Sequence, residues 1–276
     1  MHDLDRALVL GPGGRLGTAW TAGLAAGLRS FGVDLGDADL IVGTSAGAIV
    51  GAVIATGQDP ARLATVRRSA NASSAPRLPD PAVTGAVFAV LGDPGLERAE
   101  ARRRVGRIAL ETVDEEAENH LIAQRAALIA ADNWPRRPLL IPAVDAESGA
   151  PIVWDATAGV PLVRAVAASS AFPGIEPPVA VDGRRYLDGA LRAGTNTDLA
   201  GDARTVVVVD PLAHRHPQPT PDSAHILAPG PAAVRLLDTE QGDPAAWKAA
   251  YQAGRDQAGA ASEELRAHWR PVSARG

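Results

Sequence analysis

Two short apolar runs that each lead into a glycine-rich turn constrain the fold of this 276-residue chain more than any other feature. The first covers residues 7–10 and stops at the turn 11–14, after which apolar and small residues recur at helical spacing over 16–31. The second covers residues 40–42, leads directly into Gly-Thr-Ser-Ala-Gly at 43–47, and precedes another run of small apolar residues. Strands and helices that alternate in this way predict an α/β fold with a mainly parallel central sheet.

The rest of the chain contains further elements and no linker that would divide it into two parts. The patterns predict exposed helices over 96–131 with a break near Val113, strands over 138–144, 151–154 and 205–209, a helix over 161–172, and a C-terminal helical segment over about 231–270. Asp182-Gly183 lies between two alternating runs, which is typical of a β-hairpin. Pro76, Pro79 and Pro81 indicate a loop that covers the site. We therefore expect one domain over residues 1–276, with a motif-bearing core at about 7–210.

Composition and charge exclude several classes of function. A formal net charge of -5 argues against nucleic acid as a partner, because phosphate binding depends on clustered Lys and Arg. The absence of cysteine excludes disulfides and thiolate nucleophiles, and the six histidines are too scattered for a metal site, so we expect no metal and no cofactor. The N-terminus has no signal-peptide pattern, and no apolar stretch reaches the ~20 residues that span a bilayer. These features predict a cytoplasmic protein.

Gly43-x-Ser45-x-Gly47 is the pattern of a nucleophile elbow, in which a serine lies on a strained turn between a strand and a helix. Bulk at either flank would clash with the neighbouring strand and helix, which accounts for the glycines. The N-terminus of the following helix also favours developing negative charge. The pentapeptide is common by chance, so on its own it leaves two readings open: a catalytic serine, or a tight turn that packs a helix on a sheet.

The glycine-rich segment 11–17 is the second candidate element. Acyl transfer needs N–H donors that point at the oxyanion of the tetrahedral intermediate, and a glycine loop before a helix can supply them. A dinucleotide-binding loop would need glycine where Leu16 stands, and a phosphate-binding P-loop would need a Gly-Lys-Ser/Thr ending. The oxyanion function is favoured because Ser45 is present.

The third element is the base that activates the serine. His214, His216 and His225 follow Ser45 in the chain, but none lies at an obvious strand end, and the first two fall in a proline-broken loop. Asp188 directly follows the second hairpin strand and precedes Gly189, so its carboxylate can project from a rigid edge. An unperturbed aspartate has a pKa of about 3.9, and burial beside the serine would raise it. The alternative is a solvated turn residue.

Together these elements resemble the patatin-like phospholipase family. The resemblance covers four ordered blocks, at residues 10–17, 43–52, 168–174 and 181–189. It implies a three-layer α/β/α fold, a Ser-Asp dyad without histidine, and hydrolysis of lipid acyl esters without a metal. By the resemblance, Ser45 attacks the ester carbonyl, Asp188 takes its proton, and water later releases the acyl group.

The resemblance further implies an oxyanion hole made by the amides around Gly13, Gly14 and Arg15. Two positions depart from the family pattern. Ala190 stands where the dyad block has a second glycine, and we expect it to fit if its φ is negative. Leu16 stands where the family has its loop arginine, which here is Arg15.

Several weaker signals have two interpretations. Five arginines between Arg98 and Arg107 could contact anionic lipid headgroups in a transient membrane contact. Glu97 and Glu100 are interleaved with them, which favours a solvated, ion-paired helix face. Trp20 and Trp154 fit an acyl pocket or, more commonly for such residues, the core.

Three functions remain in competition on the sequence alone. The first is a lipid acyl hydrolase with a lipid or acyl-ester substrate, which the four blocks favour. The second is a generic Ser-His-Asp carboxylesterase that uses a histidine from 214–225. The third is a non-catalytic α/β module that binds a nucleotide or another ligand. The sequence does not indicate an oligomeric state.

Overall fold

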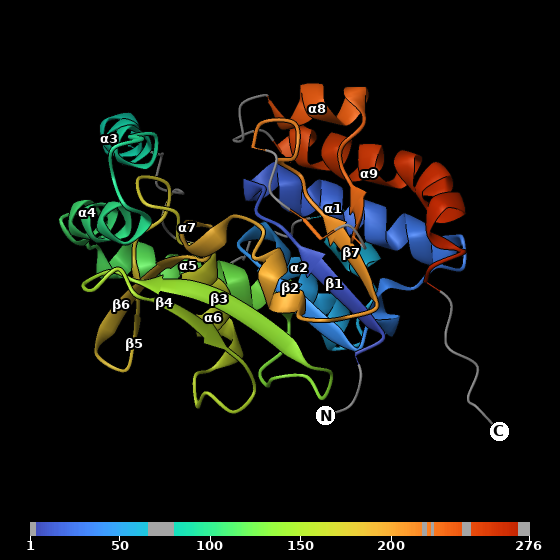
Figure 1. Ribbon diagram of the computed structural model, residues 1–276, viewed down its shortest axis with the longest axis horizontal. Helices are drawn as coiled ribbons and strands as arrows, with labels where there is room; N and C mark the ends of the chain where they lie inside the picture. The colour runs from blue at the N-terminus through green and yellow to red at the C-terminus, as the bar shows by residue number, and fades with distance from the viewer. Residues whose placement is uncertain (1–3, 66–79, 217–219, 222–223, 239–243, 270–276) are drawn as a thin grey trace.

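The computed structural model describes residues 4–65, 80–216, 220–221, 224–238 and 244–269 (Figure 1). Within these residues eight strands form one sheet, in the order β5-β6-β3-β2-β1-β7-β8, and β4 pairs with β3 beside this path. The strands are β1 (Arg6–Leu10), β2 (Leu40–Gly43), β3 (Leu139–Asp145), β4 (Pro151–Trp154), β5 (Val179–Val181), β6 (Arg184–Asp188), β7 (Thr205–Val209) and β8 (Ala224–Leu227). Strands β3, β2, β1, β7 and β8 run parallel, whereas β4 and β6 are antiparallel to β3.

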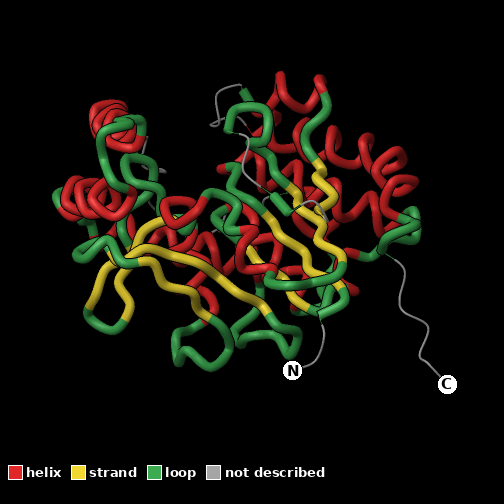
Figure 2. The backbone as a smooth tube through the Cα atoms, in the orientation of Figure 1, coloured by secondary structure: helices red, strands yellow, loops and turns green. Residues whose placement is uncertain are grey.

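Helices follow or connect most of these strands (Figure 2). They are α1 (Gly14–Ser30), α2 (Ala46–Ala55), α3 (Pro81–Leu91), α4 (Arg98–Leu110), α5 (Glu115–Ile129), α6 (Leu162–Ser169), α7 (Ala190–Ala193), α8 (Pro231–Leu237) and α9 (Pro244–Leu265), with 3₁₀ turns η1 (Leu35–Asp37), η2 (Pro60–Ala64) and η3 (Thr197–Ala200). In the described parts of the chain, none of the helices is both long and apolar enough to cross a bilayer.

The helices cover both faces of the sheet. Successive side chains of a strand point to opposite faces, so Leu8 and Leu10 join the main core with α1, α2, α5, α6, α8 and α9, while Ala7 and Val9 pack against Ala200 of η3. A third apolar cluster joins β3 and β6 to α3, α4 and α7 on this second face. The fold is therefore a three-layer α/β/α arrangement with a mainly parallel sheet, as the sequence predicted.

Most of the predicted elements are confirmed within a few residues of their expected bounds. The helix break near Val113 separates α4 from α5, and the Asp182-Gly183 hairpin joins β5 to β6 with positive φ at both turn residues. Trp20 and Trp154 are 0% and 3% exposed in the main core, which supports the core interpretation.

Other expectations need correction. The sequence predicts a loop at Pro81, but this residue is the first of α3, because its ring fixes a φ that suits the first helical turn. Pro76 and Pro79 lie outside the described residues. The helix expected over 161–172 ends at Ser169, and the C-terminal segment contains two helices, α8 and α9. Strand β8 was not predicted, because its sequence follows a proline-rich stretch and has little apolar alternation.

Candidate active site

Ser45 lies between the end of β2 and the start of α2, in a backbone conformation that few non-glycine residues adopt. Its φ is 55° and its ψ is -115°, and such strain persists only where the surroundings impose it. The amide of Thr44 donates to the carbonyl of Leu10 at 2.9 Å, and the amide of Gly47 donates to the carbonyl of Gly11 at 3.1 Å. These two bonds fix the serine turn against the end of β1 on either side of Ser45.

The two glycines of the turn lie against backbone atoms. A Cβ on Gly47 would lie 2.0 Å from the carbonyl oxygen of Leu10, and a Cβ on Gly43 would lie 2.7 Å from the carbonyl oxygen of Gly47. No side chain fits at these distances, so glycine at both positions allows β2, α2 and β1 to meet at the serine.

Asp188 is the last residue of β6 and is only 2% exposed. Its carboxylate accepts a hydrogen bond from the amide of Ala190 at 2.8 Å, and its own amide donates to the carbonyl of Ala171 at 3.0 Å. Ala190 begins the helix α7, so alanine fits where the family pattern has glycine.

The electrostatics of Asp188 suit a base. Burial disfavours its charged form and raises the pKa of the carboxyl from 3.8 to about 7. Hydrogen bonds from the Ala190 amide and the Ser45 side chain, together with the charge of Arg125, lower this pKa in part. The structure therefore joins Ser45 to a buried carboxyl group that loses its proton near neutral pH.

This raised pKa predicts that Asp188 reduces the stability of the protein at high pH. The folded state holds the Asp188 proton more tightly than the unfolded chain does. This tighter proton binding stabilises the fold fully below pH 3.8, and the stabilisation is lost as the pH rises to about 7. We expect Asp188→Asn to be more stable than the wild type at pH 8, by up to about 4 kcal/mol, because an amide carries no charge to desolvate. Urea unfolding at pH 8 and pH 4 measures this difference, which should shrink at the lower pH; an equal difference at both values would contradict it.

Ser169 connects the two candidate catalytic residues. It is 0% exposed, and its Oγ accepts a hydrogen bond from the amide of Ser45 at 3.2 Å. Its carbonyl accepts from the amide of Gly189, the neighbour of Asp188, at 3.1 Å. Sequence analysis placed Ser169 in a family-like block without a function, because nothing in the local pattern links it to residues so distant in sequence.

Asn196 makes a second connection that sequence analysis missed. The residue is 0% exposed and has a left-handed backbone, with φ at 60°. Its Nδ2 lies 3.1 Å from the Oγ1 of Thr44, which precedes Ser45, and 3.0 Å from the carbonyl oxygen of Gly189, which follows Asp188. An asparagine two residues after Gly194 is a turn signal in the sequence, but its partner Thr44, 152 residues away, is visible only in the fold.

We expect the amide of Asn196 to position Ser45 and Asp188 for reaction. Asn196→Gly keeps the backbone freedom that a φ of 60° requires but removes the amide donor. A misplaced serine should lower kcat by up to about a hundredfold with little change in KM. Steady-state kinetics on an ester would measure this split. A wild-type kcat in a folded Asn196→Gly protein, or an effect confined to KM, would refute the positioning function.

The glycine-rich loop lies beside the serine turn. Gly13 precedes α1, Gly14 has a φ of 60° and is exposed, and Arg15 is half-buried in the first helical turn. Amides in the first turn of a helix have no acceptor within that helix, so they are suited to bind a negative oxygen. The Arg15 guanidinium lies over the ring of Trp247 in α9, 5.7 Å from the ring centroid.

The histidines considered as alternative bases have other neighbours. The Nε2 of His214 lies 3.3 Å from a carboxylate oxygen of Asp238, and the ring of His225 stacks on that of His268 with centroids 4.1 Å apart. Across the described ranges, no group of three or more His, Asp or Glu side chains has an arrangement that could hold a metal ion.

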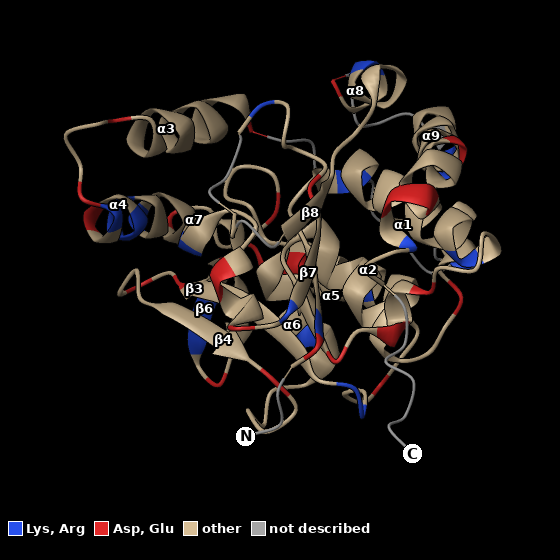
Figure 3. Ribbon diagram, turned by 45° about the vertical axis from the view of Figure 1, so that its right-hand side comes forward, with Lys and Arg blue, Asp and Glu red and all other residues tan. Residues whose placement is uncertain are grey.

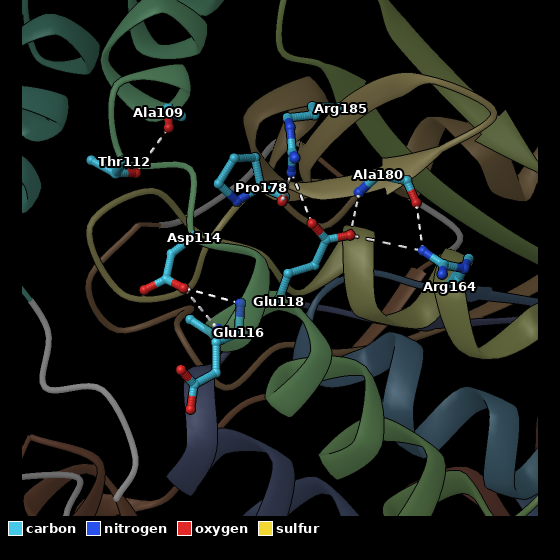
Figure 4. A network of polar contacts seen from close by, with 10 residues as sticks. Ala109, Thr112, Asp114, Glu116, Glu118, Arg164, Pro178, Ala180 and Arg185 are labelled. Atoms are coloured by element: carbon cyan, nitrogen blue, oxygen red, sulfur yellow. Dashed lines mark hydrogen bonds and ion pairs between the residues drawn. The ribbon is translucent and has the colours of Figure 1, made fainter. Parts of the chain in front are cut away.

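Two partly buried ionic networks hold the elements around Asp188. Arg125 of α5 donates to the Oγ of Ser170 at 2.8 Å and to Glu176 at 3.0 Å. Glu118, also on α5, accepts from the amide of Ala180 and from Arg185, both at 2.8 Å (Figure 4). These contacts join α5 to the loop before β5 and to the hairpin that ends in Asp188. The sequence could not predict these contacts, because the charged residues of α5 follow no pattern that identifies their distant partners.

Comparison with known proteins places the sequence in a family. Residues 8–200 match the model of the family described as patatin-like phospholipase. None of the curated proteins matches the chain. The fold is similar to that of VipD from Legionella pneumophila, with 10% identity, 95% of this chain and 67% of that chain covered, and a TM-score of 0.48.

It is also similar to the type III effector protein ExoU, with 17% identity, 97% of this chain and 54% of that chain covered, and a TM-score of 0.42. Because both TM-scores are below 0.5, the assignment rests on the family model, which covers well over half of the sequence. The chain belongs to the patatin-like phospholipase family.

Proposed function

We propose that this protein is a lipid acyl hydrolase that cleaves carboxylic acyl esters with a Ser45–Asp188 dyad. The observation that carries the proposal is the strained Ser45 beside the buried carboxyl group of Asp188, whose pKa is raised to about 7 by burial and lowered in part by the Ser45 side chain. A base is most effective when its pKa lies near the working pH. Family membership supports a lipid ester as the substrate class.

In the proposed reaction, the Oγ of Ser45 attacks the ester carbonyl while the carboxylate of Asp188 accepts the serine proton. The amides of Gly13, Gly14 and Arg15 stabilise the oxyanion of the tetrahedral intermediate. The intermediate collapses to an acyl-serine, and the leaving alcohol takes the proton from Asp188. A water molecule then attacks the acyl group, with Asp188 again as the base, and releases the fatty acid and free Ser45.

Two features favour this mechanism over a Ser-His-Asp triad. His214 lies beside Asp238 and the ring of His225 packs on that of His268, and neither of these neighbours belongs to the serine turn. Asp188 needs no intermediate histidine, because burial alone raises its proton affinity into the neutral range. The generic esterase therefore has less support than the dyad.

Labelling with a fluorophosphonate tests the nucleophile without a guess at the substrate. We expect an adduct on Ser45, located by peptide mass spectrometry, that is absent in Ser45→Ala and strongly slowed in Asp188→Asn. Single His214→Ala, His216→Ala and His225→Ala variants should label like the wild type. The proposal fails if folded wild-type protein takes no label on Ser45. Full labelling of Asp188→Asn with loss in a histidine variant would favour the triad instead.

A further inference from the structure

Arg125 is a partly buried cation, in contrast to the arginines at the surface of α4. Arg103 and Arg104 are exposed and pair with Glu100, as the sequence interpretation favoured. The side chain of Arg125 is 11% exposed and lies on α5, which packs against α6 and α2 (Figure 3). Water screens a partly buried charge less than a surface charge, so the guanidinium of Arg125 acts more strongly on groups near it.

Three polar contacts fix the guanidinium of Arg125. Its Nε donates to the Oγ of Ser170 at 2.8 Å, and its Nη2 lies 3.0 Å from a carboxylate oxygen of Glu176. A longer contact of 3.4 Å joins its Nη1 to the Oε1 of Gln124. Ser170 is 7% exposed, and its hydroxyl donates to the carbonyl of Val166 at 2.9 Å. The hydroxyl therefore donates to its own helix and accepts from α5, which gives the guanidinium a defined position.

Ser170 lies between two residues that contact the dyad. Ser169, which precedes it, accepts the hydrogen bond from the amide of Ser45 at 3.2 Å. Ala171, which follows it, accepts the hydrogen bond from the amide of Asp188 at 3.0 Å. The guanidinium bonded to Ser170 therefore lies beside the segment that contacts both members of the dyad.

The charge of Arg125 opposes the effect of burial on Asp188. Burial raises the pKa of this carboxyl to about 7, and hydrogen bonds from the Ala190 amide and the Ser45 side chain act against burial. Among the described residues, Arg125 supplies the charge that lowers the pKa in the same direction as these hydrogen bonds. Without this charge the carboxyl would keep its proton to a higher pH, and less of the protein would hold a base at neutral pH.

We propose that Arg125, fixed on Ser170, is a positioning residue whose charge keeps the carboxylate of Asp188 ready to accept a proton. The inference rests on the proposed function, because only a reaction that uses Asp188 as a base gives this charge its purpose. A residue that only stabilised the fold would change the rate by the same factor at every pH.

The pH profile of kcat/KM on a soluble ester tests the inference. Arg125→Met removes the charge and keeps most of the apolar stem. Its midpoint should lie about half a pH unit above that of the wild type, a smaller shift than the loss of a directly contacting ion would cause. The value of kcat/KM should then fall about threefold at pH 6 and stay unchanged at pH 9. Arg125→Lys keeps the charge and should have the wild-type midpoint.

Two results would overturn the inference. One is an equal loss in Arg125→Met at pH 6 and pH 9, which would assign Arg125 to the stability of the fold. The other is a midpoint raised as far in Arg125→Lys as in Arg125→Met, since the charge would then not be the cause. If Arg125→Met does not fold, Glu176→Gln decides. It removes the negative charge paired with Arg125, so the midpoint should move to lower pH, and an unchanged or raised midpoint contradicts the inference.

Arg185→Met is the matched control. Arg185 also pairs with a glutamate of α5, Glu118, at 2.8 Å, but it is not among the groups that shift the pKa of Asp188. Its loss should leave the midpoint unchanged, and a shift equal to that of Arg125→Met would contradict the inference.

A carbon-13 NMR titration of labelled aspartate follows the Asp188 carboxyl without turnover, with its signal assigned by its absence in Asp188→Asn. This titration gives the midpoint even in a protein without esterase activity. Failure of the proposed hydrolase, which fluorophosphonate labelling of Ser45 tests, is therefore distinguished from failure of the function inferred for Arg125.

Discussion

Asp188→Asn is expected to lower kcat/KM for a carboxylic ester by about a thousandfold at pH 8, because the variant has no base to accept the proton of Ser45. The asparagine can still accept the hydrogen bond from the Ala190 amide, so the fold around the site should persist. Steady-state kinetics on a soluble ester measures the change, and the fluorophosphonate rate should fall in parallel.

The pH profile separates a base from a residue that only shapes the turn. The charged carboxylate is the active form, and its pKa is raised to about 7, so wild-type kcat/KM should rise with pH and level off above about 7. In Asp188→Asn the residual rate should lose this step. A step of the same midpoint in the variant would assign the titration to another group.

Asp210 provides a matched control for this substitution. It follows β7, is 4% exposed, and its carboxylate accepts from the amide two residues ahead, that of Leu212, at 2.9 Å. Burial raises the pKa of Asp210 as well. Because it shares burial and hydrogen bonding with Asp188 but lacks the bond to Ser45, Asp210→Asn should change kcat/KM by less than about tenfold. A larger loss in Asp210→Asn than in Asp188→Asn would contradict the dyad.

Local patterns were sufficient to predict the elements that carry the candidate site. The apolar runs before the two glycine-rich turns predicted β1 and β2, and Asp182-Gly183 predicted the hairpin that ends in Asp188. Each of these signals depends on neighbours in sequence, such as turn chemistry or a short buried strand. The assignment of residues 1–276 to one domain, and the site residues themselves, stay predictions.

The contacts between distant segments could not be predicted in this way. Ser169 and Asn196 reach Ser45 and Thr44 across 124 and 152 residues, and a single sequence does not record which buried polar groups are partners. Helix α3 was missed because its single proline and its small residues resemble a loop, and its apolar outer face hides the usual helical periodicity. Sequence reasoning therefore proposed the Ser45–Asp188 dyad but not the buried polar contacts that surround these two residues.

Gly47→Ala is expected to destabilise the fold by about 3 kcal/mol or more, the upper range for added bulk in a packed site. The new Cβ would lie 2.0 Å from the carbonyl oxygen and 2.3 Å from the carbonyl carbon of Leu10, so relief requires that α2 move away from β1. That movement would also separate Ser45 from the glycine-rich loop. We therefore expect loss of esterase activity even in the fraction that stays folded.

Gly85→Ala makes the same substitution without the contact. Gly85 lies within α3, and a Cβ there would meet nothing within 4 Å, so alanine should stabilise the protein by about 0.5–1 kcal/mol through its higher helix propensity. Urea midpoints for both variants measure the contrast. If Gly47→Ala unfolds at the wild-type urea concentration, the serine turn does not depend on the close approach of α2 to β1, and the elbow loses its structural basis. If Gly47→Ala is destabilised while Gly85→Ala is not, the loss of folding free energy arises from the contact with Leu10 and not from the exchange of glycine for alanine.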